Sequence, residues 1–263
     1  MLTESSVVYD KKELRTMAVN GWNVLPPNTI PDVQLDPILD KMYDGYTGPS
    51  EEVEAVGIGE INLFYFFLPK SFWLHVASES NRYWSQTLED RVETAYTNQA
   101  SAHERPREKI KARLSKAKPI LPHELIRWLG LLVARMLNPS KHLEMHWSKG
   151  SIGVLPPGMF GSVMSRDRFK FISAFLHLSD NKSERARIDR AWKVRPILQT
   201  IESTFANGFI LGKHIAIDEA MLPSTNRRNP TRQYLKNKPH KWGSKCVMVC
   251  CADTGYCQRQ VLS

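Results

Sequence analysis

The chain has 263 residues, of which 42% are hydrophobic and 24% charged, as in a globular protein of one large domain or two modest ones. Residues 1–100 carry 7 Lys and Arg against 15 Asp and Glu, residues 101–180 carry 14 against 6, and residues 181–263 carry 15 against 6. The excess of basic residues in 101–263 attracts polyanions, so nucleic acid is the partner that we expect. A solvated basic face without a partner is the alternative.

Membrane insertion and metal binding by cysteine are both disfavoured by the sequence. The most apolar run, residues 125–137, is interrupted by two arginines and is too short to cross a bilayer. The first residues lack the basic and apolar blocks of a signal peptide. The spacing of the four cysteines fits no common zinc module, so we expect small apolar residues of a buried strand in a reducing compartment. They are Cys246, Cys250, Cys251 and Cys257.

Residues 1–50 are punctuated by prolines and acidic residues, which predicts a partly disordered acidic leader. Residues 51–213 are predicted to be mainly helical. Pro69 is suited to begin a helix that carries Phe72, Trp73 and Val76. Residues 101–118 alternate Arg and Lys with other residues, which indicates an exposed helix, a mobile linker or a stretch that contacts phosphates or directs nuclear import.

Three further features predict helices in this region. Pro122 precedes an apolar stripe at helical spacing over residues 125–136. Ser165 is a suitable N-cap for a helix with an apolar face. Pro196 begins a helix that we expect to end at Asn207-Gly208 in a left-handed cap.

The hydrophobic period changes to two after Gly212, which predicts strands. Ile215 and Ile217 alternate with other residues, residues 245–251 are apolar on both faces, and a third strand begins at Tyr256 after the turn Asp253-Thr254-Gly255. The fold class that we predict is therefore α+β, with a helical region followed by antiparallel strands. Because no helix follows these strands in the sequence, we expect residues 214–263 to be poorly covered and to expose an edge strand.

Asp218 ends the apolar run of the first predicted strand, and a group of cations follows it in the sequence. A carboxylate oxygen is a hard ligand for Mg²⁺, and a cluster of cations suits the phosphates of a nucleic acid. Asp218 is thus our candidate catalytic and metal-binding residue. The candidate DNA-binding residues are Arg227, Arg228, Arg232, Lys236, Lys238, Lys241 and Lys245.

The order of several short motifs resembles that of PiggyBac-type transposases. The most specific are Ile217-Asp218-Glu219, the run from Gln233 to Lys245 (QYLKNKPHKWGSK), and Thr254-Gly255-Tyr256. Upstream, in the same order as in the family, lie Glu79–Tyr83 (ESNRY), Trp147-Ser148, Met164–Phe169 (MSRDRF), Leu176–Asn181 (LHLSDN) and Lys193–Pro196 (KVRP). The loop Pro223–Arg227 departs from the family pattern by lacking two glycines and an aromatic residue.

This resemblance implies a DDE/D transposase fold, in which three aspartates on an RNase H-like sheet hold two divalent metals, usually Mg²⁺. Asp218 would be the first aspartate. The second and third would lie beyond Ser263, so we expect residues 214–263 to be the truncated start of a catalytic domain.

We therefore expect a nuclear, PiggyBac-derived DNA-binding remnant that is inactive as a transposase. Its helical region would correspond to the dimerisation and DNA-binding part of the family. Two alternatives remain open. The chain is a fragment of an active Mg²⁺-dependent transposase, or it is an interaction module that forms a homodimer or associates with full-length transposase and regulates it.

Overall fold

The structure is a computed structural model that describes residues 11–12, 15–16, 43–57, 59–99, 105–151, 153–154 and 156–262. Most of the predicted leader lies outside the described residues. The chain divides into two units, Met1–Asp44 and Gly45–Ser263, and the fold below is that of the second unit. Its α-helices are α2 (Glu51–Val56), α3 (Glu60–Phe67), α4 (Lys70–Gln86), α5 (Leu88–Thr97), α6 (Arg107–Leu114), α7 (Pro122–Leu137), α8 (Arg166–Phe175), α9 (Arg185–Ile188) and α10 (Arg195–Gly208). Two 3₁₀ turns, η3 (Leu143–Trp147) and η4 (Phe160–Ser162), lie between α7 and α8.

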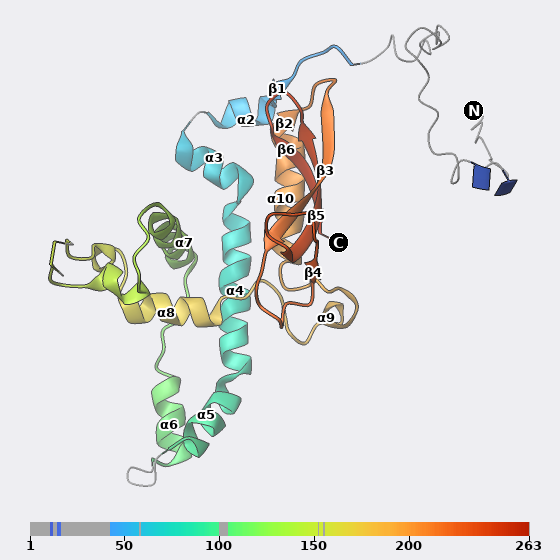
Figure 1. Cartoon of the computed structure of the whole chain (residues 1–263). Coiled ribbons are helices and arrows are strands. Elements are labelled where there is room, and N and C mark those ends of the chain that lie inside the picture. The colour runs from blue at the N-terminus through green and yellow to red at the C-terminus, as the bar shows by residue number, and fades with distance from the viewer. Residues whose placement is uncertain are drawn as a thin grey trace, which may run out of the picture. The chain divides into compact units, whose positions relative to one another are not determined.

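The strands are β1 (Gly48–Pro49), β2 (Phe209–Ile210), β3 (Ile215–Pro223), β4 (Arg232–Tyr234), β5 (Trp242–Cys251) and β6 (Cys257–Leu262) (Figure 1). Helices therefore precede the main group of strands, which confirms the predicted α+β class. None of the helices in the described part of the chain is both long and apolar enough to cross a membrane.

The helical core forms where α4, α7 and α8 pack together. Each helix begins where the sequence indicates: Pro69 is the N-cap of α4, Pro122 is the first residue of α7, and the Ser165 side chain accepts a hydrogen bond from the backbone of Arg168 at 3.3 Å. The residues buried between these helices include Phe72, Trp73, Val76, Leu125, Leu131, Phe169 and Ile172. The apolar spacing of the sequence thus becomes the actual contact faces of the helices.

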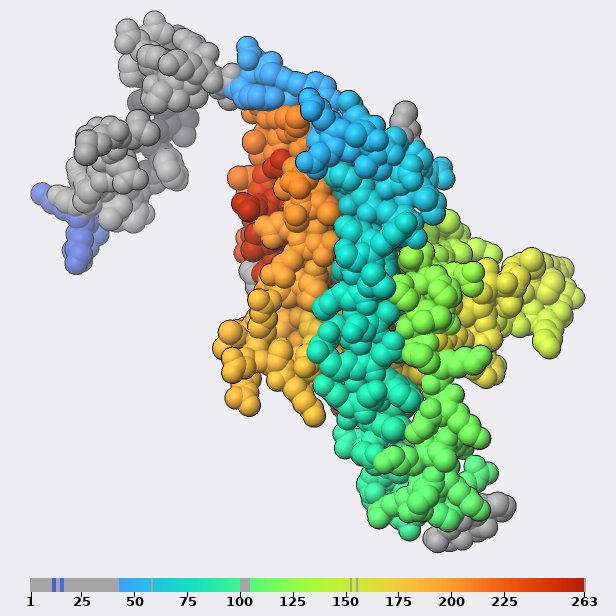
Figure 2. Space-filling model, turned by 180° about the vertical axis from the view of Figure 1, so that it is seen from behind, coloured from blue at the N-terminus to red at the C-terminus, as the bar shows by residue number. Residues whose placement is uncertain are grey.

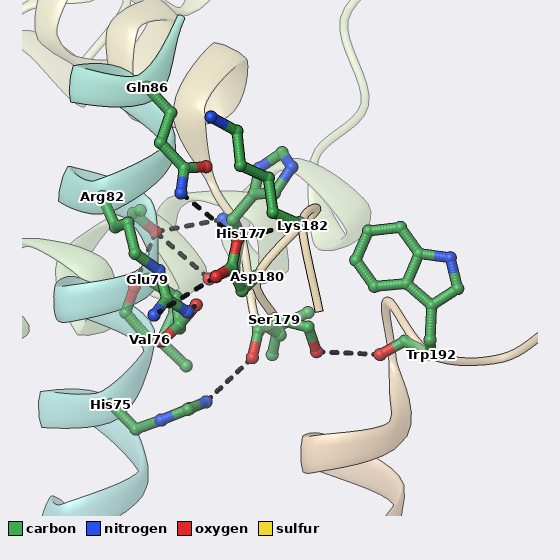
Figure 3. A network of polar contacts seen from close by, with 12 residues as sticks. His75, Val76, Glu79, Arg82, Gln86, His177, Ser179, Asp180, Lys182 and Trp192 are labelled. Carbon is green, nitrogen blue, oxygen red and sulfur yellow. Dashed lines mark hydrogen bonds and ion pairs between the residues drawn. The ribbon is translucent and has the colours of Figure 1, made fainter. Parts of the chain in front are cut away.

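The ESNRY and LHLSDN motifs meet in space, although about 100 residues separate them (Figure 3). The Ser80 hydroxyl accepts a hydrogen bond from the His177 backbone at 3.0 Å, and the Tyr83 and His177 rings stack with centroids 3.6 Å apart. Asp180 accepts a hydrogen bond from Gln86 at 3.2 Å and lies 3.7 Å from the Arg82 guanidinium. These motifs hold α4 against the segment that follows α8.

Two arginines of the other motifs also form paired hydrogen bonds to carboxylates, Arg168 across 44 residues and Arg195 across six. Arg168 of MSRDRF donates to both carboxylate oxygens of Glu124 on α7, at 2.8 and 2.6 Å. Arg195 of KVRP donates to both carboxylate oxygens of Asp189, at 2.7 and 2.6 Å. Hydrogen bonds from these arginines hold the pKa of each carboxyl below its usual value. Paired, bidentate geometry of this kind fixes the position of one helix relative to its neighbour.

The four strands β3 to β6 form one antiparallel sheet with β5 at its centre. β3 pairs with the whole of β5 along one side, whereas β4 and β6 pair with its two halves along the other. The three strands predicted from the alternating pattern are therefore confirmed. β4 was missed because its three residues lie within a basic segment that carries no alternating apolar pattern.

The expectation that no helix covers this sheet is wrong for one of its faces. α10, which precedes the sheet in the sequence, packs along β6. Cys246 and Leu262 are buried on the covered face together with Ala191, and Leu198 and Met248 pack against them. Figure 2 shows α10 beside α4. Phe72, near the start of α4, and Gln199 and Thr200 of α10 are among the residues that line a pocket between the two helices. The sheet is thus anchored to the helical core through α10.

Gly208 ends α10 for a different reason from the one that the sequence indicates. Its φ angle is not in the left-handed region, so the predicted left-handed cap is wrong. A Cβ atom at this position would lie 2.8 Å from the Tyr256 hydroxyl and 2.9 Å from the Phe67 ring. The chain continues directly into β2, which pairs with β1. Close packing, and not a turn, requires glycine here.

Candidate nucleic-acid interface

Asp218 lies in the middle of β3, opposite Met248 of β5, with its side chain 87% exposed. One carboxylate oxygen accepts a hydrogen bond from the Glu219 backbone at 2.7 Å. The other lies 3.9 Å from the Lys238 ammonium group, which also donates to the Glu219 carbonyl. The Lys245 ammonium group forms an ion pair with the Glu219 carboxylate. Each acidic side chain of this pair therefore has a lysine beside it.

These contacts separate the seven candidate DNA-binding residues into two sets. Lys238 and Lys245 are half-buried and engaged with the acidic pair on β3, which reduces the charge that they present to a ligand. The other set is exposed and, among the residues that the structure describes, forms no ion pair with a carboxylate. It consists of Arg227, Arg228, Lys236 and Lys241. We call these four residues the exposed basic set.

The β3–β4 loop holds Arg227 and Arg228 in a defined turn. The Asn226 side chain accepts a hydrogen bond from the Arg228 backbone at 2.9 Å, as in an Asx turn. Behind the turn, the Thr231 and Ser244 hydroxyls lie 2.5 Å apart, which ties the loop to β5. The loop therefore presents its two arginines from a fixed base although it lacks the glycines of the family pattern.

Lys236 and Lys241 flank the turn that joins β4 to β5. This turn is closed by a hydrogen bond from the Leu235 backbone to the Lys241 carbonyl at 2.8 Å. Arg232, the remaining candidate, is half-buried, and its guanidinium lies 3.8 Å from the centre of the Trp242 ring. Arg232 is thus part of a cation–aromatic contact, and the two lysines are the exposed charges of the hairpin.

Two aromatic residues of this hairpin were missed as candidates. Tyr234 is 49% exposed and Trp242 is 45% exposed, and they are direct partners across β4 and β5. The sequence carried a signal for them, because both lie within the lysine-rich QYLKNKPHKWGSK run. Their exposure, in contrast, depends on the pairing of β4, which the sequence pattern did not predict.

The other basic stretch of the sequence is partly neutralised by its neighbours. Residues 107–114 form α6, which packs against α5. Arg107 lies 2.8 Å from Glu93, and Lys111 lies 2.5 Å from Glu89. Within the predicted stretch, residues 107–114 are therefore a helix with exposed, partly paired charges, as in the first of the structures expected for it. This helix offers a control surface for experiments on the exposed basic set.

The side chains around Asp218 do not by themselves fit a divalent metal. Within the described part of the chain, no group of three or more His, Cys, Asp or Glu side chains is placed to hold an ion. Mg²⁺ prefers six oxygen ligands, and here one exposed carboxylate lies beside a lysine. The arrangement around Asp218 provides one ligand of the type that a metal centre needs. A complete metal centre is absent from the residues that the structure describes.

Comparisons with known proteins agree with the motifs. The family described as Transposase IS4, a DDE-type transposase family, matches residues 60–261. A solved structure described as "Cryo-EM structure of piggyBac transposase synaptic complex with hairpin DNA (SNHP)" has a similar fold, with a TM-score of 0.60 and 22% sequence identity. The alignment covers 83% of this chain and 41% of that chain. No curated protein matches the sequence.

The chain belongs to the DDE-type transposase family that matches residues 60–261. Members of this class depend in general on divalent metals, so the predicted Mg²⁺ is consistent with the family even though the described residues do not complete a site. The fold resembles that of a piggyBac transposase over most of the chain, and the chain spans less than half of the length of that transposase.

Proposed function

We propose that this chain is a transposase-derived DNA-binding protein of PiggyBac type that acts in the nucleus. The exposed basic set supports this proposal most strongly. Its four cations lie on two structured turns at one end of the sheet and form no ion pair with a described carboxylate. Fixed, unpaired cations of this kind suit phosphate oxygens, which are spaced regularly along a nucleic-acid backbone.

We infer further that the 263-residue chain does not cut or join DNA on its own. Two-metal catalysis needs several carboxylates around a pair of ions, and Asp218 is the one that the motif identifies. The Lys238 ammonium group lies 3.9 Å from the Asp218 carboxylate and would compete with a metal ion for it. In this proposal Asp218 and Glu219 serve to hold Lys238 and Lys245, and so to shape the hairpin.

A second candidate is a transposase fragment in which Asp218 supplies one metal ligand and other polypeptide supplies the rest. The 87% exposure of the Asp218 side chain favours this candidate, because further ligands could reach it. Both candidates predict that the chain alone leaves supercoiled DNA intact with Mg²⁺ or Mn²⁺. They differ when the chain is joined to, or mixed with, the remaining part of a piggyBac-type transposase, because metal-dependent nicking that then appears and disappears in Asp218→Ala would support the second candidate, and its absence would argue against it.

A third candidate is a regulatory module that binds another copy of the chain or an intact transposase. It is favoured by the exposed apolar end of α7, where Met136 is 80% and Leu137 is 82% exposed. Light scattering of the purified chain tests the homodimer directly. A concentration-dependent dimer that is lost in Met136→Lys would support this candidate, and a monomer at all concentrations would argue against self-association.

The DNA-binding proposal is tested by the salt dependence of affinity for a short duplex. We expect the logarithm of the binding constant to fall with the logarithm of salt with a slope of roughly −4 to −5, from about 4 to 6 neutralised phosphates. Changing the four residues of the exposed basic set to Gln should reduce the magnitude of that slope by about 3.6, because each phosphate contact contributes about 0.9.

A matched control separates local contacts from net charge. Changing Arg105, Lys109, Arg113 and Lys116 to Gln removes the same four charges from exposed positions in and beside α6. This variant should keep a slope close to that of the unmodified chain. Equal losses in the two variants would mean that only the overall charge attracts DNA, and the proposed interface would then be wrong.

A further inference from the structure

The hairpin of β4 and β5 carries an aromatic pair that the basic set alone does not explain. The Tyr234 and Trp242 rings have centroids 4.9 Å apart, at an angle of 57° to each other. Both side chains remain about half exposed although large aromatic residues gain most from burial. Arg232 packs 3.8 Å from the centre of the Trp242 ring and so fixes that ring on one side.

The hairpin holds this pair rigidly. Tyr234 and Trp242 are register partners, and the next residue, Gly243, lies so close to β3 that a Cβ atom there would be 2.2 Å from the Leu222 carbonyl oxygen. The Ser224 backbone also donates to the Trp242 carbonyl at 3.0 Å. Because the platform is already ordered, a ligand that stacks on it loses little conformational freedom of the protein.

The charges around the pair indicate the chemistry of the ligand. Lys236 and Lys241 lie on the same hairpin, both exposed and within a few residues of the rings. A ligand that satisfies flat aromatic faces and ammonium groups together combines planar rings with negative charge. Single-stranded nucleic acid does so, because each nucleotide offers a base with a free face and a phosphate. In a duplex the base faces are covered by their neighbours.

We propose that Tyr234 and Trp242 form a stacking platform for an unpaired nucleobase of DNA. This inference rests on the proposed function, since the exposed basic set is what holds the DNA backbone. The platform adds a preference for DNA that contains unpaired bases, such as a single-stranded end, a bubble or a flipped base. It would take any of the four bases, because stacking requires only a planar face.

The register of the sheet relates the platform to Asp218. Asp218 is opposite Met248, and Trp242 precedes Met248 by six residues on β5, so alternation places Trp242 and Asp218 on the same face. At about 3.3 Å per residue the two positions are about 20 Å apart along the strand. Cys246 and Met248, which lie between them on this same face, pack under α10, so the platform is separated from Asp218 by a covered part of the sheet.

The test compares two probes, a 12-nucleotide oligothymidylate and a 12-base-pair blunt duplex, with fluorescence anisotropy at one salt concentration. Trp242→Ala should weaken binding of the single strand by about five-fold or more, the lower end of the range for one stacked base, and should change duplex binding by less than about two-fold. Trp242→Phe, which keeps a ring, should recover most of the single-strand affinity, and Tyr234→Ala should behave like Trp242→Ala.

Tyr96→Ala is the matched control. Tyr96 is also exposed, at 37%, and also has an arginine over its ring, since the Arg107 guanidinium lies 4.4 Å from the ring centre. It lies on α5, away from the exposed basic set in the sequence, and its loss should leave both affinities unchanged. Thermal unfolding of each variant shows whether a loss of affinity reflects a loss of fold, and Trp242→Phe keeps the test decisive if Trp242→Ala unfolds.

The outcomes separate this inference from the proposed function. Duplex binding that depends on the exposed basic set, together with single-strand binding that Trp242→Ala leaves unchanged, would overturn the platform and leave the DNA-binding function standing. Equal losses of affinity for both probes in Trp242→Ala would also overturn the platform. A platform that stacks only on unpaired bases does not contribute to duplex binding, so its removal should leave that binding unchanged. If the chain bound neither the single strand nor the duplex, both the platform and the proposed DNA-binding function would be overturned.

Discussion

Replacing Arg168 with Met should destabilise the native state by about 2–4 kcal/mol. Arg168 makes two hydrogen bonds to Glu124 and one each to the carbonyls of Lys118 and Pro119, all between 2.6 and 2.8 Å. The paired side chains are only 19% and 18% exposed. Removing one partner of a buried pair costs about 3–5 kcal/mol, and we reduce that figure because water still reaches about a fifth of each side chain.

Arg166 provides the control for this prediction on the same helix. It lies two residues earlier and pairs with Asp167, but the two side chains are 50% and 86% exposed. Exposed pairs contribute at most about 1 kcal/mol, so Arg166→Met should change stability by less than that. Urea unfolding followed by circular dichroism measures both variants. Equal changes for the two arginines would refute the structural role that we assign to Arg168.

The pH dependence of stability offers an independent check on the same pair. Hydrogen bonds from Arg168 are the main cause that holds the pKa of Glu124 below its ordinary value of 4.5. The unfolded chain therefore binds a proton on Glu124 at higher pH than the native state does. The stabilisation is complete above pH 4.5 and is lost as pH falls below that value through the folded pKa. In Arg168→Met this part of the acid sensitivity should disappear.

Three further predictions concern stability elsewhere in the fold. Gly243→Ala should destabilise the sheet by about 1–3 kcal/mol, because the new Cβ atom meets the Leu222 carbonyl. Gly130→Ala in α7 places its Cβ atom in open space and should stabilise the protein by about 0.5–1 kcal/mol. Urea unfolding that shows the same sign for both variants would contradict the packing described. Burial lowers the pKa of His146 below 6.5, so the free energy of unfolding should fall as the pH is lowered from 7.5 to 5.5. His146→Phe should lose less free energy of unfolding over that range. An unchanged pH profile in this variant would contradict the lowered pKa. Amide hydrogen exchange in β5 should be as slow as in α7, because β5 is paired on both sides and covered by α10; fast exchange there would restore the expectation of a poorly packed sheet.

Elements whose signals are local could be predicted from the sequence. Pro122 and Ser165 mark helix starts because a proline or a hydroxyl at that position satisfies the first turn within a few residues. The strands β3 and β5 are recognisable because their own residues alternate or are apolar on both faces. In each case the stabilising contact and the signal lie within the same segment.

Features that depend on distant segments could not be predicted in the same way. The cover that α10 gives to the sheet was missed because the search for a covering helix looked only after the strands, while α10 precedes them. β4 is three residues long and exists through its pairing with β5. The sequence suggested that Gly208 caps a helix. The structure shows instead that a side chain at this position would meet the Tyr256 side chain, 48 residues later.

The candidate site was predicted in part. The segment that carries Asp218 and the cations could be identified from the sequence, because charged residues and motifs are recognised without a structure. It did not separate Lys238 and Lys245, which face the acidic pair, from Lys236 and Lys241, which do not. That separation depends on side-chain directions on β5 and its hairpin, which only the pairing register determines.

Lysine footprinting with and without DNA tests the central claim most directly. Acetic anhydride modifies exposed lysines, and mass spectrometry reports each one separately. At low salt, a short duplex should protect Lys236 and Lys241 from acetylation several-fold, while Lys109 and Lys116, which are also exposed, should react as they do without DNA. Protection of Lys109 and Lys116 instead, or uniform protection of all four, would contradict the assignment of the DNA interface to the β3–β4 loop and the β4–β5 hairpin.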